Sequence, residues 1–288
     1  MTSGGRIPAA IALVLFIIAT GTSSFQAFRH KSWMFWSLIL SGLLFIVAFA
    51  IRLSNSSDDE YRDWALMNVA IIPHSLAAFF LQQAVFMLFL RLVWWTAPSP
   101  STLNRRTLWF SPRVGFYFMS GTLFLLAVVQ AVPIPIFVFC GLIAQMILLA
   151  VFLAFVGRVW TVSKGWAGLV QGERLPGAWR RKGLVGVWAM SGLLMLRTIL
   201  CWIFVLLGGA ESFLNVYLFD TLPLLVCFIL IACLHPGTYM PVDYTRLRMD
   251  RDSVMQTKMA DSRVAELTRD AYLAANSSGT TAGRTESV

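Results

Sequence analysis

The chain has 288 residues, of which 58% are hydrophobic and 13% are charged, whereas soluble domains have about 45–50% apolar and about 25% charged residues. This balance excludes a water-soluble globular protein, and the apolar segments leave no room for a large soluble domain. The formal net charge of +9 would suit nucleic acid, but the positions of the cations favour membrane topology and attraction to anionic lipid headgroups. No nucleic-acid partner is therefore expected.

Seven apolar runs of transmembrane length follow one another along the chain. They predict an all-α polytopic bundle, because the ten-residue alternation of a β-barrel does not recur. The first run follows only Arg6 and lacks a small-residue cleavage site, so it is interpreted as a helix and not as a signal peptide. The predicted spans cover residues 7–28, 33–51, 65–93, 115–132, 136–156, 184–207 and 216–234. Together they form a transmembrane domain over 1–240, followed by a polar tail over 241–288 whose composition is largely that of disorder.

The distribution of Lys and Arg predicts the orientation of this bundle. Most of the 23 cations lie after the first, third and fifth spans and in the tail, whereas the alternate segments hold only Arg6, Arg52 and Arg62. The segment after the second span is acidic, with four acidic residues in 58–63. Because cations are retained on the cytosolic side during insertion, we expect the N-terminus outside and the C-terminal tail in the cytosol.

A glycosylation sequon is compatible with this orientation. Asn55-Ser56-Ser57 lies in the loop expected outside, but its closeness to the membrane hinders modification, so Asn55 is a candidate that stays open. A second sequon at Asn276 lies in the tail, on the side without the glycosylation machinery. We expect the protein in the plasma membrane, with another endomembrane as the alternative.

Two ionisable residues lie inside predicted spans, Arg197 in the sixth and Asp220 in the seventh. Such a group costs at least about 2.5–3.5 kcal/mol near the centre of the bilayer, so it usually faces the bundle interior and has a partner. A rise of about 1.5 Å per residue puts Arg197 about 15 Å and Asp220 about 6 Å below the outer end. An arginine side chain can bridge that difference. An Arg197–Asp220 pair is therefore predicted, either as a structural lock or as part of a substrate path.

Other polar residues are expected in the same outer half. By the same rise per residue, His74 lies about 14 Å deep and Gln145 about as deep, while Gln130 lies near the outer end and Gln82 and Gln83 lie deeper. Each residue alone is more typical of an interhelical hydrogen bond than of a ligand contact. Several of them at one depth indicate an outward-facing polar cavity as the alternative.

Two prolines adjoin these polar groups. Pro73 precedes His74, and Pro223 follows Asp220 by about one turn. Each proline removes a helical hydrogen bond and frees a carbonyl, which in lipid needs another partner. Both are candidate kinks, and either a hinge or a static kink fits the sequence.

The residues do not indicate an enzyme, a metal or a cofactor. The four cysteines lie in apolar runs and are interpreted as small buried hydrophobes. His30, His74 and His235 are expected on different segments at different depths, and no paired carboxylates or nucleophile motif occurs. The chain also has no Walker A sequence, so ATP is not expected as the direct energy source.

Several short motifs in the chain match one known family. Gly141-Leu142-Ile143-Ala144-Gln145 resembles a Gly-Leu-x-x-Gln motif, Tyr217-Leu218-Phe219-Asp220 with Leu222-Pro223 resembles a Tyr-x-x-Asp segment, and His235-Pro236-Gly237 matches a closing His-Pro-Gly. The positions that also fit are Pro73, Ala77, Ala78, Arg91, Gln130 and Arg197. In their order and spacing over roughly 170 residues, these motifs resemble the RTA1-like family of fungal membrane proteins, also called the lipid-translocating exporter family.

The resemblance implies seven spans with the tail inside, and export or flipping of amphipathic lipids such as sphingoid long-chain bases, or resistance to toxic compounds. Membrane lipids and an amphipathic small molecule are the expected partners. The candidate substrate-path residues are Asp220, Arg197, His74, Gln145, Gln130 and Tyr217. The chain departs from the family at Cys201, where a second arginine is expected, and near Phe204, where a glutamate is expected, so it resembles a divergent member. A seven-helix receptor or sensor without transport activity is the alternative.

Overall fold

The computed structural model describes residues 6–32, 35–54, 60–96, 112–132, 134–166, 177–206 and 215–235. Within these ranges the chain is helical, which confirms the predicted all-α polytopic bundle. Six described helices are long and apolar enough to cross a membrane, and a shorter apolar segment, Tyr217–Cys233, follows them. The protein is therefore an integral, multi-pass membrane protein. The candidate glycosylation site Asn55 and the predicted tail over 241–288 lie outside the described residues.

Each predicted span corresponds to a helix, and three of the helices extend well beyond the apolar run that predicted them. In these three helices the α-helical backbone hydrogen bonds continue into the polar residues that flank the apolar run. Hydropathy identifies only the apolar part of such a helix. The bounds are α1 Arg6–Arg29, α2 Trp36–Ser54, α3 Glu60–Thr96, α5 Pro112–Ala131, α6 Pro135–Trp166, α7 Gly177–Leu206, the π-helix η4 Asn215–Thr221, and α8 Leu222–Cys233. The seventh span is thus π-helical in its first part.

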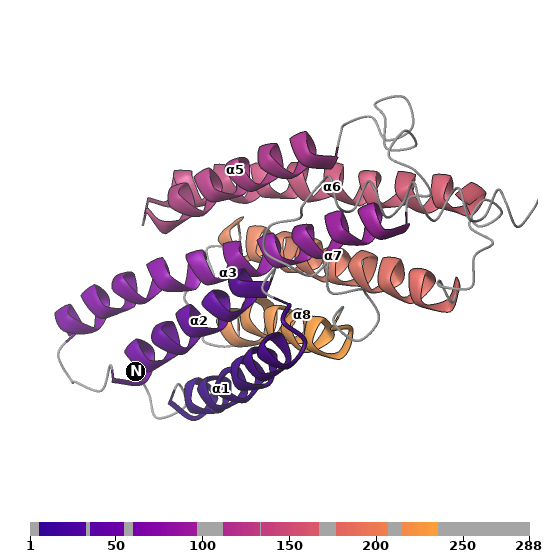
Figure 1. Ribbon diagram of the computed structural model, residues 1–288. Coiled ribbons are helices and arrows are strands. Elements are labelled where there is room, and N and C mark those ends of the chain that lie inside the picture. The colour runs from indigo at the N-terminus through magenta and orange to yellow at the C-terminus, as the bar shows by residue number, and fades with distance from the viewer. Residues whose placement is uncertain are drawn as a thin grey trace, which may run out of the picture.

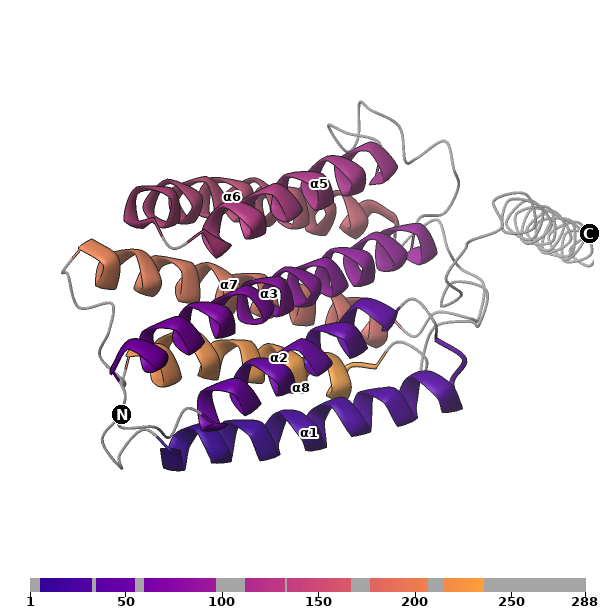
Figure 2. The same cartoon turned by 90° about the vertical axis from the view of Figure 1, so that its left-hand side faces the viewer.

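Helix α3 is the centre of the bundle. It contacts α2, α5, α6, α7 and α8, and it is the most buried of the six long helices, whereas α5 is the least buried. Helices α5 and α6 lie on one side of α3 and α7, and α1, α2 and α8 lie on the other (Figures 1 and 2). Aromatic side chains fill the space on both sides. Phe16 of α1 stacks on Phe45 of α2 at 4.5 Å between ring centroids, and Phe86 of α3 lies 4.1 Å from Phe152 of α6.

Small residues bring α1, α2 and α3 close together. A Cβ atom at Gly42 would overlap the side chain of Thr20, so α2 needs a glycine where it crosses α1. The hydroxyl of Ser41 donates a hydrogen bond of 2.7 Å to the carbonyl of Ala77 on α3. Close packing of this kind, and not a hydrophobic driving force, associates helices in lipid.

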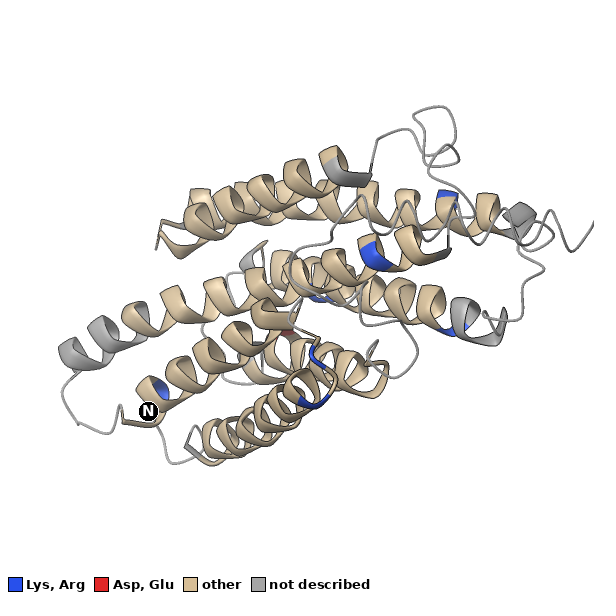
Figure 3. Ribbon diagram, viewed as in Figure 1, with Lys and Arg blue, Asp and Glu red and all other residues tan. Residues whose placement is uncertain are grey.

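The basic residues gather toward one end of the bundle (Figure 3). At this end α1, α3 and α6 finish and α7 begins, and these segments carry Arg29, Arg91, Arg158 and Lys182. Arg52 lies at the opposite end, in the last turn of α2. The alternating direction of the helices therefore brings together the cations that predict a cytosolic face.

Candidate functional site

Asp220 lies at the junction between a π-helix and an α-helix. It is the penultimate residue of η4, and Pro223 lies in the first turn of α8. A proline in a first helical turn removes no needed donor, so Pro223 coincides with the change of helix type and does not interrupt an α-helix. Pro73 does lie inside an α-helix, α3, one residue before His74. Short π segments are frequent at functional sites, because they turn side chains away from the regular helical positions.

An ion cluster joins three helices at Asp220. The Nε atom of Arg197, on α7, donates a hydrogen bond of 2.5 Å to Oδ1 of Asp220. The Nε2 atom of His74, on α3, lies 2.6 Å from Oδ2. Arg197 and His74 are 7% and 6% exposed, so both are held inside the bundle. The predicted Arg197–Asp220 pair is present, and His74 is its third member.

The surroundings of His74 indicate its tautomer. The Nδ1 atom is buried and has no hydrogen-bond partner among the described residues. The rings of Phe45 and Phe49 contact the imidazole edge to face, at 5.3 and 6.1 Å between centroids. A proton on Nδ1 would be left without an acceptor, so the hydrogen-bond pattern favours a neutral imidazole that donates from Nε2 to Asp220. The cluster then contains one guanidinium and one carboxylate, so its net charge is close to zero.

Two further side chains lie close to the ion cluster. The thiol of Cys201, one turn after Arg197 on α7, lies 3.8 Å from Oδ1 of Asp220. Tyr217, one turn before Asp220, places its ring 6.1 Å from that of Phe49. Tyr217 therefore lies next to Phe49, whose ring contacts His74. The contact with Cys201 was missed by the sequence reasoning, although the motif comparison had singled that position out.

The interpretation of all four cysteines as buried was wrong. Cys227 is buried and Cys201 is partly buried, but Cys140 and Cys233 are exposed on the outside of the helices. A thiol is a weak donor that behaves as a small hydrophobe, so these two positions are compatible with contact to lipid. All four cysteines are free.

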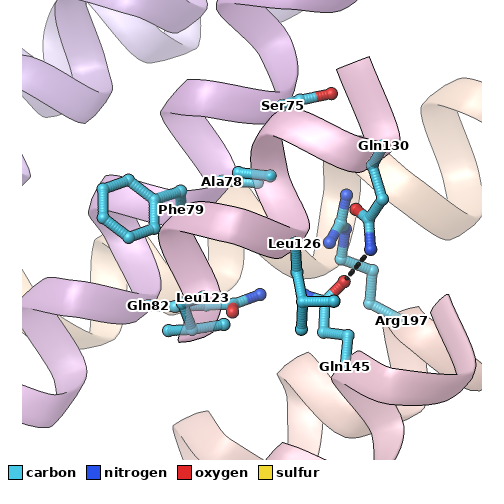
Figure 4. A pocket seen from close by; sticks show the side chains of 10 residues that line it. Ser75, Ala78, Phe79, Gln82, Leu123, Leu126, Gln130, Gln145 and Arg197 are labelled. Carbon is cyan, nitrogen blue, oxygen red and sulfur yellow. Dashed lines mark hydrogen bonds between the residues drawn. The ribbon is translucent and has the colours of Figure 1, made fainter. Parts of the chain in front are cut away.

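A small polar cavity lies beside the ion cluster, between α3, α5, α6 and α7 (Figure 4). Its volume is about 20 Å³, enough for one water molecule, which needs roughly 10–15 Å³. Arg197 lines it and also bonds Asp220, so the guanidinium connects the two features. The lining residues are Ser75, Ala78, Phe79, Gln82, Leu123, Leu126, Ala127, Gln130, Gln145 and Arg197.

The two predicted glutamines meet in this cavity. The Nε2 atom of Gln130 on α5 donates a hydrogen bond of 2.8 Å to Oε1 of Gln145 on α6. Gly141 makes room for the side chain of Gln130, because a Cβ atom at this position would lie 2.8 Å from Cγ of Gln130. Gln82 and Ser75 are the polar lining residues that the sequence did not assign to a site. The spacing of Ser75, Ala78, Phe79 and Gln82, three to four residues apart, is the signal that could have placed them on one face of α3.

The expectation that the three histidines lie apart was wrong for two of them. The rings of His30 and His235 lie 5.3 Å apart, where α1 and α8 end, and the Ser32 hydroxyl is 3.1 Å from Nε2 of His235. Burial, and then the nearby His30, lower the pKa of His235 to about 4. Among the described residues, no three His, Cys, Asp or Glu side chains come together as a metal site would require.

No protein-family model, curated protein or solved structure matches the chain. The site itself combines a buried, nearly neutral ion cluster with an adjoining cavity of amide and hydroxyl groups. Such an arrangement can bind a polar group and exchange hydrogen-bond partners within the membrane.

Proposed function

We propose that this multi-pass membrane protein translocates amphipathic, lipid-like compounds or confers resistance to them, as its resemblance to the RTA1-like family implies. The observation that carries the proposal is the cluster of Arg197, Asp220 and His74 beside a polar cavity. Buried ionisable groups are expensive in a membrane protein and commonly mark the path of a substrate or an ion. A bundle that needed only stability would be served as well by apolar contacts.

The size of the cavity bears on how transport would proceed. A volume of about 20 Å³ does not admit the headgroup of a lipid, so translocation requires the helices around the cavity to move apart. Helix α5 contributes four lining residues and is the least buried of the six long helices. Its displacement would therefore uncover the smallest share of buried residues among these six helices. We therefore propose that α5 moves while α3 and α7, which carry His74 and Arg197, stay packed together.

A sensor without transport activity is the second candidate function. The small cavity favours it, because a sensor needs only two arrangements of the cluster and no continuous route for a lipid. The two candidates differ in one measurable property, which is movement of the compound across the membrane.

The test is survival and export in a fungal host. Cells that lack or overproduce the protein are challenged with sphingoid bases, azoles and other amphipathic toxins, and the release of a labelled compound from preloaded cells is measured. The decisive variant is the neutral pair Arg197→Gln with Asp220→Asn, which removes both charges and leaves no unpaired ion. Ser191→Ala is the matched control, because Ser191 is a buried residue of the same helix whose hydroxyl donates to the backbone carbonyl of Val187, one turn earlier.

The neutral pair is expected to keep its abundance in the membrane and to lose resistance and export, while Ser191→Ala keeps both. Full resistance and export with the neutral pair would contradict the proposed role of the cluster. A phenotype that depends on Arg197 and Asp220 without release of any labelled compound would favour the sensor.

A further inference from the structure

Among the residues that line the cavity, Gln82 stands out because its buried side-chain amide lacks hydrogen-bond partners within the described part of the chain. This residue is 1% exposed, and both its amide oxygen and its amide nitrogen are buried with no hydrogen-bond partner among the described residues. Its amide points into the cavity (Figure 4). A buried amide without partners is costly, and native proteins leave few of them. A molecule bound in the cavity would supply the hydrogen-bond partners that the Gln82 amide lacks.

The charge that lines the cavity is positive. Arg197 is the charged residue among those that line it, whereas Asp220 bonds the Nε atom of Arg197 and is not part of the lining. The remaining polar lining consists of Gln82, Gln130, Gln145 and Ser75, which are neutral hydrogen-bonding groups. An ammonium group in this space would meet a guanidinium and no carboxylate. An oxyanion would meet the guanidinium and several amide or hydroxyl donors.

We propose that this cavity, once the helices around it have moved apart, is the binding site for the oxyanion headgroup, a phosphate or a carboxylate, of an amphiphile. Guanidinium and amide N–H groups together are the donors that bind such anions most strongly, because their hydrogen bonds are charge-assisted and directional. The inference rests on the proposed function and narrows it. Phosphorylated or carboxylated amphiphiles are preferred over cationic bases of the same chain length, including the sphingoid bases that the family resemblance implies.

The helices around the cavity also indicate where the headgroup enters. The ring of Phe79 on α3 contacts that of Phe124 on α5, with 5.6 Å between their centroids. Phe124 is 51% exposed and therefore faces the surrounding lipid, while Phe79 lines the cavity. Separation of these two rings would open the cavity between α3 and α5 to the bilayer. The headgroup then enters sideways from the membrane, and the alkyl chain stays in lipid.

Binding to the purified, full-length protein tests this site without any transport step. The probes are dodecyl phosphate, dodecanoate and dodecylamine, titrated below their micellar concentrations into protein in lipid nanodiscs, with empty nanodiscs subtracted. Gln82→Leu is the test variant, and Gln83→Leu is its matched control. Gln83 is the next residue of α3, is a partly buried glutamine, and does not line the cavity.

Dodecyl phosphate and dodecanoate are expected to bind at least about tenfold more tightly than dodecylamine. Gln82→Leu should weaken the two anions by about tenfold, the size of one hydrogen bond to a charged group, and leave the amine unchanged. Gln83→Leu should behave as the wild type. Equal or tighter binding of dodecylamine, or anion binding that is insensitive to Gln82→Leu, would overturn the proposal. Failure of the fungal export test with anion selectivity intact would instead reject transport and keep the binding site.

Discussion

The energetic coupling between Arg197 and Asp220 gives the sharpest test of the ion cluster. Both side chains are largely buried, and Nε of Arg197 lies 2.5 Å from Oδ1 of Asp220. Removing one partner of a buried pair leaves an uncompensated charge, which typically costs about 3–5 kcal/mol. Asp220→Asn and Arg197→Gln should each lower the free energy of unfolding by this amount. The double variant contains no buried charge and should recover to within about 1–2 kcal/mol of the wild type.

The assay is unfolding of the purified protein in mixed micelles with increasing amounts of denaturing detergent, followed by tryptophan fluorescence. The coupling energy is the difference between the effect of the double variant and the sum of the single effects. A value of several kcal/mol is expected, with Ser191→Ala within about 1 kcal/mol of the wild type as the control. Additive single effects would refute the reasoning, because the two charges would then be solvated separately and would not compensate one another.

Three further predictions concern other parts of the molecule. Gly42→Ala should destabilise the bundle by about 1–3 kcal/mol, because the added methyl group overlaps Thr20. Gly21→Ala, with no atom within 4 Å of the new Cβ, should be neutral or stabilising in the same unfolding assay. The pKa of His235 is lowered from 6.5 to about 4, so the unfolded state binds the proton first and stability should fall as the pH drops from about 7 toward 4. His235→Gln should flatten this pH dependence, and an unchanged dependence would assign the titration to another group. An epitope tag after Val288 should bind antibody only after cells are permeabilised, and labelling of intact cells would reverse the predicted orientation.

Much of this architecture could be predicted because lipid restricts the chain so strongly. The spans follow from the length of the apolar runs, and the pairing of Arg197 with Asp220 follows from the cost of a charge in the membrane and from counting residues along a helix. The same counting placed His74 about 14 Å deep and Asp220 about 6 Å deep, yet their side chains meet. Distance along a helix is not depth in the bilayer when the helix is tilted, as the long α3 can be.

Other features depend on packing that a single sequence does not define. The π-helix over Asn215–Thr221 belongs to a rare class of helical irregularities, which the length and hydropathy of an apolar run do not predict. The meeting of His30 and His235 depends on how α1 packs against α8, which no local pattern encodes. By contrast, the face of α3 that carries Ser75 and Gln82 could have been recognised from helical spacing.

Arg197 is the residue through which the ion cluster and the cavity are linked. A guanidinium is a planar fork with several N–H groups, so it can donate from Nε to Asp220 and still present donors to a second acceptor in the cavity. Through Asp220 the same group is connected to η4, and through His74 to α3. An anion in the cavity would share this guanidinium with Asp220 and so weaken the contact between Arg197 and the carboxylate on η4. Under the proposed function, ligand binding and the position of the last helix would be coupled through this one side chain, as a transporter or a sensor requires.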